Sequence, residues 1–558
     1  MAEAQTELFT GTERFHVRRG LGMGGFGAVY EVYDRDTGAI LALKVLKRGD
    51  APSLYRFKRE FRALADVTHP NLVALYELVN EGGLWFFTME MVEGVDFLTH
   101  VWESHGEAAG AAGTTCHEAV RPALPTIEQA APTLAAPVPG VSGPDTSGTD
   151  DGHARPRGRA VSPRLDVLRE ALGQLTAGMI ALHAAGKLHC DIKPLNVRVT
   201  PEGRVVLLDF GLVSEGAFEP APHDGGIMGT VPYMSPEQAM ARAMTPASDW
   251  YSLGAMLYES LTGTVPFRGP IAEVLRAKQQ SEPPPPSALA EGTPSDLDEI
   301  CRGLLRREPG RRLSGRDVLA RLGRERAHLP TVETTAGRLV GRERHLRRLE
   351  QAFALARSGR LAVVHVRGAS GMGKTALLRR FLERLRERGQ AVTLAGRCFE
   401  RESVPYKALD SLVDALAQYL RALPADESRA LLPREAGALA RLFPVLAQVP
   451  GMPSGEETRP AAESPELRRR AVSALRELIA RLARRAPLVL SIDDLQWGDV
   501  DSAVLLADLL APPAPPLLAA LVYRHGDGGE NPFLQTLRPL LERSRAATQV
   551  ETVVLGEL

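Results

Sequence analysis

The most constraining feature of this 558-residue chain is a fixed order of polar residues in two short segments near its middle. Residues 189–196 read H-C-D-I-K-P-L-N, and residues 209–211 read D-F-G. Between them, apolar runs at 197–200 and 205–208 flank a Pro-Glu-Gly turn, a pattern that predicts a β-hairpin.

The residue types in these segments point to phosphoryl transfer. Asp191 can accept a proton from a hydroxyl group, and Lys193 can neutralise a phosphoryl group in transit. Asn196 and Asp209 carry the oxygen atoms that Mg²⁺ prefers as ligands. Taken singly, each would be an ordinary polar loop residue, but their order and spacing predict a magnesium-dependent phosphotransferase.

A glycine-rich segment nearer the N-terminus supports this interpretation. The pattern G-x-G-G-x-G at Gly22, Gly24, Gly25 and Gly27 lies between two strand-like runs. Glycines there allow backbone amides to approach phosphate oxygens. A Rossmann dinucleotide site is the alternative, but it requires a helix directly after the loop, whereas this loop leads into the β-rich run 28–33.

One lysine and one glutamate in the next two segments are candidates for a buried ion pair. Lys44 is the single cation in the apolar strand 40–46, and Glu60 lies on the amphipathic run 54–65. A lysine that protects a strand edge and a glutamate on a solvated helix face are the alternative interpretations. A lone cation in such an apolar strand favours the interpretation that it faces a buried anion.

A second nucleotide motif follows in the C-terminal part of the chain. The apolar run 361–366 leads into G-x-x-x-x-G-K-T, from Gly368 through Gly371 and Gly373 to Lys374 and Thr375, and a helical pattern follows. In this strand–loop–helix context, backbone amides cradle phosphates. We expect the lysine to reach the outer phosphates and the threonine to bind Mg²⁺.

Two further strands end in polar residues that complete such a site. The buried run 488–492 ends at Asp493 and Asp494, and the run 517–523 ends at Arg524. We expect Asp493 to hold Mg²⁺ through water and Asp494 to polarise an attacking water molecule. Solvated strand ends are the alternative for the acids. Arg524 is a candidate sensor of the γ-phosphate, and a surface arginine is an equal alternative.

Composition narrows the class of protein. Lys plus Arg number 67 and Asp plus Glu number 68, a balance that argues against a protein that coats nucleic acid. The four cysteines lie far apart, which argues against a disulfide framework and a Cys-rich zinc site and favours a reducing compartment. The sequence shows neither a secretory signal nor a transmembrane segment, so we expect a cytoplasmic protein.

The first zone of the chain resembles a eukaryotic-type protein kinase domain over residues 15–325. Lys193, two residues after Asp191, is similar to the serine/threonine pattern. The resemblance implies that Asp191 is the catalytic base, that Asp209 and Asn196 hold Mg²⁺, and that Lys44 pairs with the ATP phosphates and with Glu60. It also implies that Glu237 pairs with Arg312 and that Asp249 is a buried anchor. The ATP-binding residues that it implies are Leu21, Gly22, Gly24, Gly25, Gly27, Val29, Ala42, Lys44, Glu90 and Val92.

One departure from the family concerns control of the kinase. Cys190 stands where most family members carry an arginine that binds a phosphorylated activation loop. Ser214 is the only hydroxyl residue between Asp209 and Gly229. We therefore predict a kinase that phosphorylation of this loop does not switch on. A redox role for Cys190 is the less favoured alternative, because no second cysteine or helper base is in view.

The second zone resembles the AAA-type modules of signal-transduction ATPases with numerous domains. The resemblance rests on L-V-G-R-E at 339–343 and on D-D-L-Q-W-G-D at 493–499. It implies ATP and Mg²⁺ as cofactors of this zone, with strands at 391–396 and 552–555 completing the sheet. Because the helical lid and winged-helix portions of such modules are missing, we expect a C-terminally truncated module in which nucleotide binding is safer to predict than hydrolysis.

The sequence thus predicts a multidomain protein with a bilobal α+β kinase fold followed by an α/β P-loop domain with a mostly parallel sheet. The predicted parts are a tail 1–14, a kinase domain 15–328 with a disordered insert 104–160, a linker 329–338 and an ATPase domain 339–558. We expect a bacterial-type serine/threonine kinase that acts on protein substrates, with the ATPase module as a nucleotide switch or a contact for a regulatory protein. The alternatives are a pseudokinase scaffold and a switch ATPase with a docking domain.

Overall fold

The computed structural model describes most of the chain and divides it into two compact units. The described residues are 9–23, 27–47, 50–102, 163–210, 214–215, 230–324, 341–453, 465–524, 531–543 and 548–556. The first unit comprises Met1–Thr68, Ala74–Met91 and Val332–Leu558, and the second comprises His69–Val73 and Val92–Thr331. The contacts thus divide the chain inside the predicted kinase domain. The insert 104–160 and the linker 329–338 lie outside the described residues.

The N-terminal part of the first unit is an antiparallel sheet with one long helix. The strands are β1 (Phe15–Met23), β2 (Gly27–Asp34), β3 (Ile40–Leu46), β4 (Leu75–Glu81) and β5 (Leu84–Met89), in the spatial order β1-β2-β3-β5-β4. Their alternating apolar residues bury Phe15, Val32, Leu43 and Phe86 on one face of the sheet.

Helix α1 (Ala51–Leu64) packs on this sheet. It begins where the Asp50 side chain accepts a hydrogen bond from the Ser53 amide, 2.8 Å away. Its apolar residues recur at helical spacing, and Phe57 meets Phe87 of β5 with ring centroids 4.9 Å apart. The sequence pattern at 54–65 therefore predicts this helix correctly.

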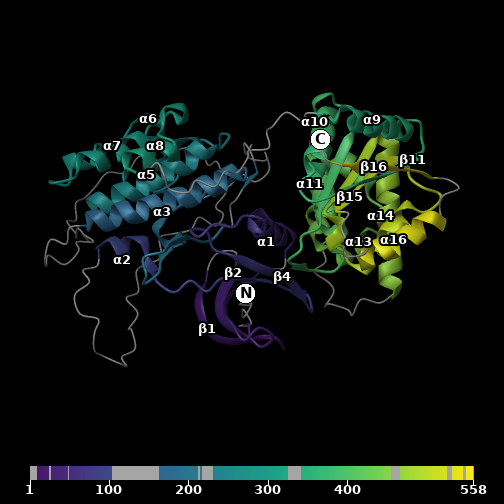
Figure 1. Cartoon of the computed structure of the whole chain (residues 1–558), viewed down its shortest axis with the longest axis horizontal. Helices are drawn as coiled ribbons and strands as arrows, with labels where there is room; N and C mark the ends of the chain where they lie inside the picture. Colours follow the sequence, from purple (N-terminus) through teal and green to yellow (C-terminus); the bar gives the residue numbers. More distant parts are fainter. Residues whose placement is uncertain are drawn as a thin grey trace, which may run out of the picture. The chain divides into compact units, whose positions relative to one another are not determined.

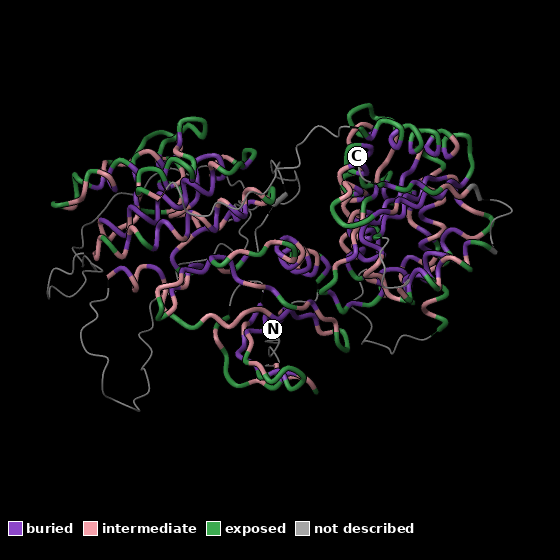
Figure 2. Tube along the Cα trace, in the orientation of Figure 1, coloured by how far each residue is buried: buried purple, intermediate pink, exposed green. Residues whose placement is uncertain are grey.

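The C-terminal part of the first unit is an α/β domain with a parallel sheet, as the sequence predicts. The strands are β11 (Leu361–Gly368), β12 (Val392–Arg397), β14 (Leu488–Asp493), β15 (Leu517–Arg524) and β16 (Thr548–Leu555), in the order β12-β14-β15-β11-β16. Every pair of neighbours is parallel. Figure 2 shows the central strands β11, β14 and β15 as buried and the outer turns of the surrounding helices as exposed.

Helices cover both faces of this parallel sheet. Helices α9 (Glu343–Arg357) and α10 (Lys374–Glu387) pack on the face that carries Ala362, Val364 and Val366. The opposite face, with Leu361 and Val363, packs against the remaining helices. These are α11 (Lys407–Ala422), α12 (Ala425–Leu431), α13 (Ala436–Leu442), η4 (Pro444–Gln448), α14 (Pro465–Arg485), η6 (Leu495–Trp497), α15 (Val500–Leu510) and α16 (Pro532–Arg543). Alternate residues of β11 thus belong to two separate cores.

A two-residue strand from the C-terminal part of the chain extends the N-terminal sheet of the first unit. Strand β13 (Glu402–Ser403) belongs to the C-terminal part of the chain, but it pairs in parallel with β4. The Leu78 amide donates to the Arg401 carbonyl oxygen over 3.0 Å. The edge of the N-terminal sheet is therefore covered by a segment from the ATPase zone, which the sequence analysis did not foresee.

The second unit is mainly helical. Its elements are β6 (Val95–Asp96), α2 (Phe97–Trp102), α3 (Leu165–Ala184), β7 (Lys187–Leu188), η1 (Pro194–Asn196), β8 (Val197–Val199), β9 (Val205–Leu207), β10 (Ser214–Glu215), α4 (Pro236–Ala239), α5 (Pro246–Thr262), α6 (Ile271–Gln280), η2 (Pro286–Ala288), α7 (Ser295–Leu304), η3 (Pro309–Arg311) and α8 (Gly315–Arg321). Strands β8 and β9 form the predicted hairpin. In Figure 1 the helices of this unit gather around α3. Within the described residues, no helix is both long and apolar enough to cross a membrane.

Candidate functional site

Lys44 and Glu60 form a buried ion pair in the first unit. The Lys44 Nζ atom on β3 lies 2.6 Å from the Glu60 Oε1 atom on α1. Both residues are buried, so the alternatives of an edge lysine and a solvated glutamate are wrong. A buried pair of this kind costs several kcal/mol to break on one side, because the remaining charge stays uncompensated. The pair therefore fixes the position of α1 relative to β3.

The strands place the other predicted ATP-binding residues of this unit along one sheet. Gly22 of β1 lies opposite Val29 of β2, and Val29 lies opposite Lys44 of β3. A side chain at Gly27 would place its Cβ 2.7 Å from the Val45 carbonyl oxygen, so this position requires glycine.

The remaining predicted ATP-binding residues are distributed between the two units. Leu21 is a half-buried residue near the end of β1, and Ala42 of β3 pairs with Met89 at the end of β5. The Glu90 amide, directly after β5, donates to the Ala74 carbonyl oxygen over 2.8 Å. Val92 belongs to the second unit, and Gly24 and Gly25 lie outside the described residues.

The second unit gathers three polar side chains around Asp191. The Lys193 Nζ atom lies 2.7 Å from Asp191 Oδ2, and the Asn196 Nδ2 atom donates to the Asp191 carbonyl oxygen over 2.8 Å. Thr230 was not predicted as part of this cluster. Its amide and hydroxyl both donate to Asp191 Oδ1, over 3.1 and 2.9 Å. The Asp191 carboxylate is thus held in one orientation by donors from two segments.

The two predicted magnesium ligands of this unit lie at the start and just beyond the end of the β8–β9 hairpin. Asn196 directly precedes β8, Asp209 follows β9, and the Leu208 amide donates to the Asn196 carbonyl oxygen over 2.7 Å. Asp209 has a φ of 56°, a left-handed conformation that is uncommon outside glycine, and its side chain is exposed. An amide oxygen and a carboxylate are hard ligands that fit Mg²⁺.

Asp249 holds the backbone of the two residues that directly precede Asp191 in the chain. Its carboxylate accepts hydrogen bonds from the amides of His189 and Cys190, over 2.9 and 2.8 Å. Burial opposes ionisation of Asp249, but hydrogen bonding and charge from His183 keep its pKa below the ordinary value. Cys190 is 3% exposed and has a φ of 66°. The anchor therefore holds a strained residue whose thiol has little access to solvent.

The predicted ion pair between Glu237 and Arg312 is confirmed. Two guanidinium nitrogens of Arg312 lie 2.6 and 2.7 Å from the two carboxylate oxygens of Glu237. Ser248 adds a hydrogen bond to the same carboxylate over 2.6 Å. Burial alone would raise the pKa of Glu237, but the arginine lowers it below the ordinary value. The segment of the predicted activation loop at 216–229 lies outside the described residues.

The P-loop motif lies in its predicted setting, between β11 and α10. Gly371 and Gly373 have φ values of 78°, which glycine adopts without strain. The Lys374 Nζ atom donates to the carbonyl oxygens of Gly368 and Ala369, over 2.9 and 2.7 Å. Burial and the charge of Arg524 lower the pKa of Lys374. A cation at the N-terminus of a helix, above a glycine-rich turn, fits a phosphate group.

The acidic strand end faces the P-loop. The Thr375 hydroxyl donates to Asp493 Oδ2 over 2.6 Å, so the hydroxyl and carboxylate predicted to hold Mg²⁺ are neighbours. Both acids are buried, which argues against solvated strand ends, and burial raises the pKa of Asp493. Arg524 is half-exposed, with its Nε atom 3.9 Å from Asp494 Oδ1. These four residues therefore form one cluster with the P-loop.

Arg397 is a member of this cluster that the sequence analysis missed. Its Nε atom lies 2.8 Å from Asp494 Oδ2, and its guanidinium group also pairs with Asp66, which follows α1. The available signal was its position at the end of the predicted strand 391–396, beside the acidic strand end. Arginines are frequent in this part of the chain, so the position alone did not distinguish it.

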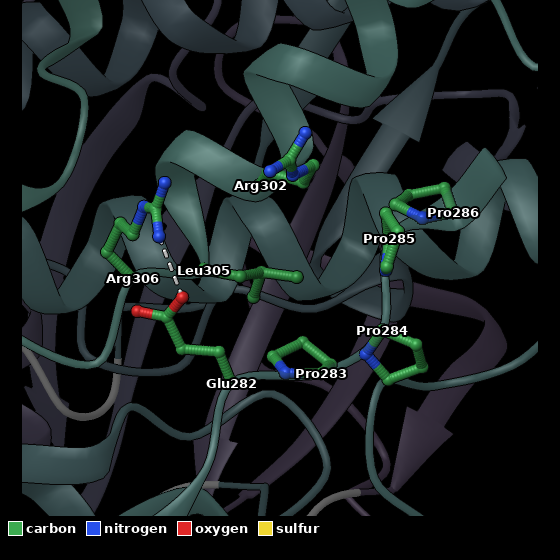
Figure 3. A pocket seen from close by; sticks show the side chains of 8 residues that line it. All are labelled: Glu282, Pro283, Pro284, Pro285, Pro286, Arg302, Leu305 and Arg306. Carbon is green, nitrogen blue, oxygen red and sulfur yellow. Dashed lines mark hydrogen bonds and ion pairs between the residues drawn. The ribbon is translucent and has the colours of Figure 1, made fainter. Parts of the chain in front are cut away.

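A small hollow in the second unit is separate from the predicted site residues. It is lined by Glu282, Pro283, Pro284, Pro285, Pro286, Arg302, Leu305 and Arg306. Glu282 and Arg306 form an ion pair of 2.9 Å at its edge (Figure 3). None of the predicted catalytic or metal-binding residues lines this hollow.

Comparisons with known proteins agree with this geometry. Residues 15–124 and 155–322 match the family described as protein kinase domain, and residues 338–522 match the family described as AAA ATPase domain. The chain is 30% identical over 307 residues to the serine/threonine-protein kinase PknA of Mycobacterium tuberculosis, covering 54% of this chain and 58% of PknA. It is 32% identical over 303 residues to PknL of the same organism, covering 54% of this chain and 62% of PknL.

A third relative is the serine/threonine-protein kinase PrkC of Bacillus subtilis. It is 26% identical over 300 residues, covering 53% of this chain and 38% of PrkC. The chain therefore spans less than two thirds of the length of each of these relatives.

Proposed function

The chain belongs to the protein kinase family and carries an AAA ATPase domain behind its kinase domain, and from this premise we propose that it is a magnesium-dependent serine/threonine protein kinase. The γ-phosphoryl group of ATP is transferred to a hydroxyl group of a protein substrate. A cytoplasmic site of action belongs to the proposal, in keeping with the free thiols of Cys190, Cys301 and Cys398.

The observation that carries the proposal is the arrangement around Asp191. Its carboxylate is fixed by Thr230, with Lys193 at 2.7 Å, which is the arrangement that a base for a substrate hydroxyl and a cation for the moving phosphoryl group require. In the proposal Asn196 and Asp209 hold Mg²⁺, and Lys44 orients the ATP phosphates. The meeting of these groups around one triphosphate is part of the proposal.

Phosphate transfer from labelled ATP to a generic basic protein tests this role. Asp191→Asn removes the proton acceptor and should lower kcat by about 100-fold or more. Asp166→Asn, at an exposed aspartate of α3, is the matched control and should keep the full rate. Transfer that continues at the parent rate in Asp191→Asn would contradict the proposal.

The ATPase domain acts in this proposal as a nucleotide switch. Thr375 and Asp493 would hold Mg²⁺, Lys374 would contact the outer phosphates, and Asp494 would orient an attacking water molecule. The contacts that support it are the Thr375–Asp493 hydrogen bond and the position of Lys374 at the start of α10. The proposal that this domain is a nucleotide switch is also compatible with a regulatory protein that binds it.

Variants of the basic residue Lys374 and the acidic residue Asp494 separate nucleotide binding from hydrolysis. We expect Lys374→Ala to weaken the binding of a fluorescent ATP analogue at this site and to abolish phosphate release. Asp494→Asn should keep binding but lower phosphate release by about 100-fold, because the water loses its orienting group. Equal loss of binding in both variants would contradict the role given to Asp494.

The alternative of a pseudokinase or docking scaffold is not favoured, because Lys44, Glu60, Asp191, Asn196 and Asp209 are all present. The transfer assay with labelled ATP decides between an active kinase and such a scaffold. Transfer that is lost in Asp191→Asn and still measurable in Lys374→Ala supports the kinase. No transfer in the parent chain, with phosphate release lost in Lys374→Ala, supports the scaffold.

A further inference from the structure

Helix α1, which carries Glu60, is joined to the ATPase domain by a buried group of charges that we call the α1 cluster. It consists of Lys58, Arg62, Glu402, Asp410 and Asp414. The first two residues lie on α1, and the two aspartates lie on α11. All of them belong to the first unit.

The contacts in the α1 cluster are short and mutual. The Lys58 Nζ atom lies 2.8 Å from carboxylate oxygens of both Asp410 and Asp414. Arg62 donates to Glu402 and Asp410 over 2.5 Å each and to Asp414 over 2.7 Å. The two cations are one helical turn apart, and so are the two aspartates. One face of α1 therefore matches one face of α11 in charge and spacing.

Burial makes this match specific. Lys58 is 1% exposed, and the three acidic residues are 2% to 6% exposed. The apolar surroundings include the rings of Trp85, 5.7 Å from Lys58 Nζ, and of Phe399, 5.6 Å from the Arg62 guanidinium carbon. A buried charge that loses its partner costs several kcal/mol. Any movement of α1 away from α11 would therefore leave charges unpaired.

A second connection leads from the end of α1 to the P-loop site. Arg397 pairs with Asp66, just after α1, and its Nε atom lies 2.8 Å from Asp494. Asp494 also lies near Arg524 and accepts a hydrogen bond from Gln496 over 2.9 Å. One guanidinium group thus links the segment after α1 with the acidic residue proposed to orient water beside the nucleotide.

We propose that the ATPase domain holds α1 in the position in which Glu60 pairs with Lys44, and that nucleotide at the P-loop site adjusts this hold through Arg397 and Asp66. This inference rests on the proposed function and names the regulation of the kinase site. A charge or water molecule that arrives beside Asp494 competes with Arg397 for its carboxylate. The change reaches Asp66, while the α1 cluster keeps the helix docked. The Lys44–Glu60 pair must be in place for phosphoryl transfer in kinases.

The simpler interpretation is that these contacts form a rigid interface, which holds α1 against the ATPase domain in every nucleotide state. It predicts that substitutions at the P-loop and at Asp66 act independently on the kinase rate. Coupling predicts that they do not. A double-mutant cycle in the full chain therefore separates the two interpretations.

The cycle combines Lys374→Ala with Asp66→Asn and measures kcat for phosphorylation of a generic basic protein. In the parent chain, Lys374→Ala should change kcat by about fivefold or more while leaving it measurable. In the Asp66→Asn background, the same substitution should change kcat by less than about twofold. The matched control, Asp501→Asn, removes an exposed aspartate that pairs with Arg468 over 2.7 Å. It should leave the fivefold response intact.

A second measurement examines the α1 cluster itself. Asp414→Asn keeps the shape of the side chain but removes one charge, so Lys58 and Arg62 lose part of their compensation. We expect faster amide exchange in α1 and a kcat reduced by about tenfold or more. Affinity of the P-loop site for a fluorescent ADP analogue should stay within about twofold, which shows that the ATPase domain is folded. Glu435→Gln, at an exposed pair with Arg470, is the control for loss of an acidic residue.

Three experimental outcomes would each overturn the inference. They are equal effects of Lys374→Ala with and without Asp66→Asn, no effect of Lys374→Ala on kcat, or unchanged amide exchange and kcat in Asp414→Asn. The proposed function has its own test: if Asp191→Asn abolishes transfer and Lys374→Ala abolishes phosphate release, the function stands even when the cycle shows no coupling. Transfer that survives Asp191→Asn removes the function instead.

Discussion

Asp209 and Cys190 both adopt left-handed backbone conformations without being glycine. Such conformations cost about 1 to 3 kcal/mol each and persist only where the surroundings determine them. At Cys190 the determining group is the Asp249 carboxylate, which accepts hydrogen bonds from two successive amides. The Asp249 carboxylate therefore holds the backbone directly before Asp191 in a locally unfavourable conformation.

The sequence identified several individual residues correctly because their chemistry is unusual for their position. Lys44 is the single cation of an apolar strand, and the structure gives it a buried partner in Glu60. Arg397 and Thr230 were missed because neither residue type nor spacing sets them apart. Their significance comes from a neighbour distant in the chain, which a local pattern does not record.

His365 of β11 offers a prediction about pH. It is buried next to Tyr523, and burial, with the nearby charges of Arg538 and Arg367, lowers its pKa to about 4. In the unfolded chain its pKa is about 6.5, so between pH 6.5 and 4 the unfolded state binds a proton that the folded state does not. Stability therefore falls as the pH drops through this window.

We expect His365→Phe to weaken that pH dependence. At pH 4.5 the histidine accounts for a loss of about 2 kcal/mol in the free energy of unfolding relative to pH 7, and the variant should lack this loss. Urea denaturation of both proteins at the two pH values measures the difference. The same fall in stability in both proteins would show that His365 is not the group responsible.

At the scale of elements, sequence patterns located most helices and strands. The strand–loop–helix around Gly368 was predictable because a P-loop needs a fully apolar strand before it and a helix after it. Strand β13 was not predictable, because two residues carry no periodicity and its partner β4 lies in another zone. The same holds for the α1 cluster. Lys58 and Arg62 recur at the spacing of a solvated helix face, although both are nearly or fully buried.

Helix α5 provides a prediction about packing. A Cβ atom at Gly254 would lie 2.7 Å from the Leu304 Cβ atom of α7, closer than real contacts allow. Replacing glycine by alanine in a helix gains up to about 1 kcal/mol, but overpacking costs about 1 to 3 kcal/mol. Gly254→Ala should therefore lower the free energy of unfolding by about 1 kcal/mol.

Gly437 in α13 is the matched control for this substitution. Its nearest neighbour to an added Cβ is Pro453, 3.9 Å away, so only the gain in helix propensity remains. Gly437→Ala should raise stability, by up to about 1 kcal/mol. Urea denaturation measures both variants, and stabilisation by Gly254→Ala would show that α7 yields to the extra methyl group.

At the scale of the whole molecule, domain order in the sequence and compactness in space differ. The sequence places a boundary near residues 329–338, whereas the contacts group the N-terminal sheet with the ATPase zone. The sequence and the structure agree about which motifs are present. They differ about which parts of the chain belong to the same compact unit. Interfaces between domains depend on matching surfaces, and no single segment of the sequence records such a match.

This grouping predicts how the chain unfolds. Amides of β3 and β5 should lose protection from hydrogen exchange at the same temperature as amides of β11 and β14. Lys58→Met breaks the α1 cluster on one side and should separate the two losses. Hydrogen exchange measured along a temperature series tests this. Different temperatures for these strands in the parent chain would contradict the grouping.

The pairing of β4 with β13 has a consequence for how the protein is made. The Arg401 side chain donates to the Leu75 carbonyl oxygen across 326 positions of the chain. On the ribosome, the last strand of the N-terminal sheet is therefore synthesised long after its partner, and an open β-edge is a surface on which nascent chains aggregate. The β4 edge of this protein therefore stays uncovered until residues 401–403 have been synthesised.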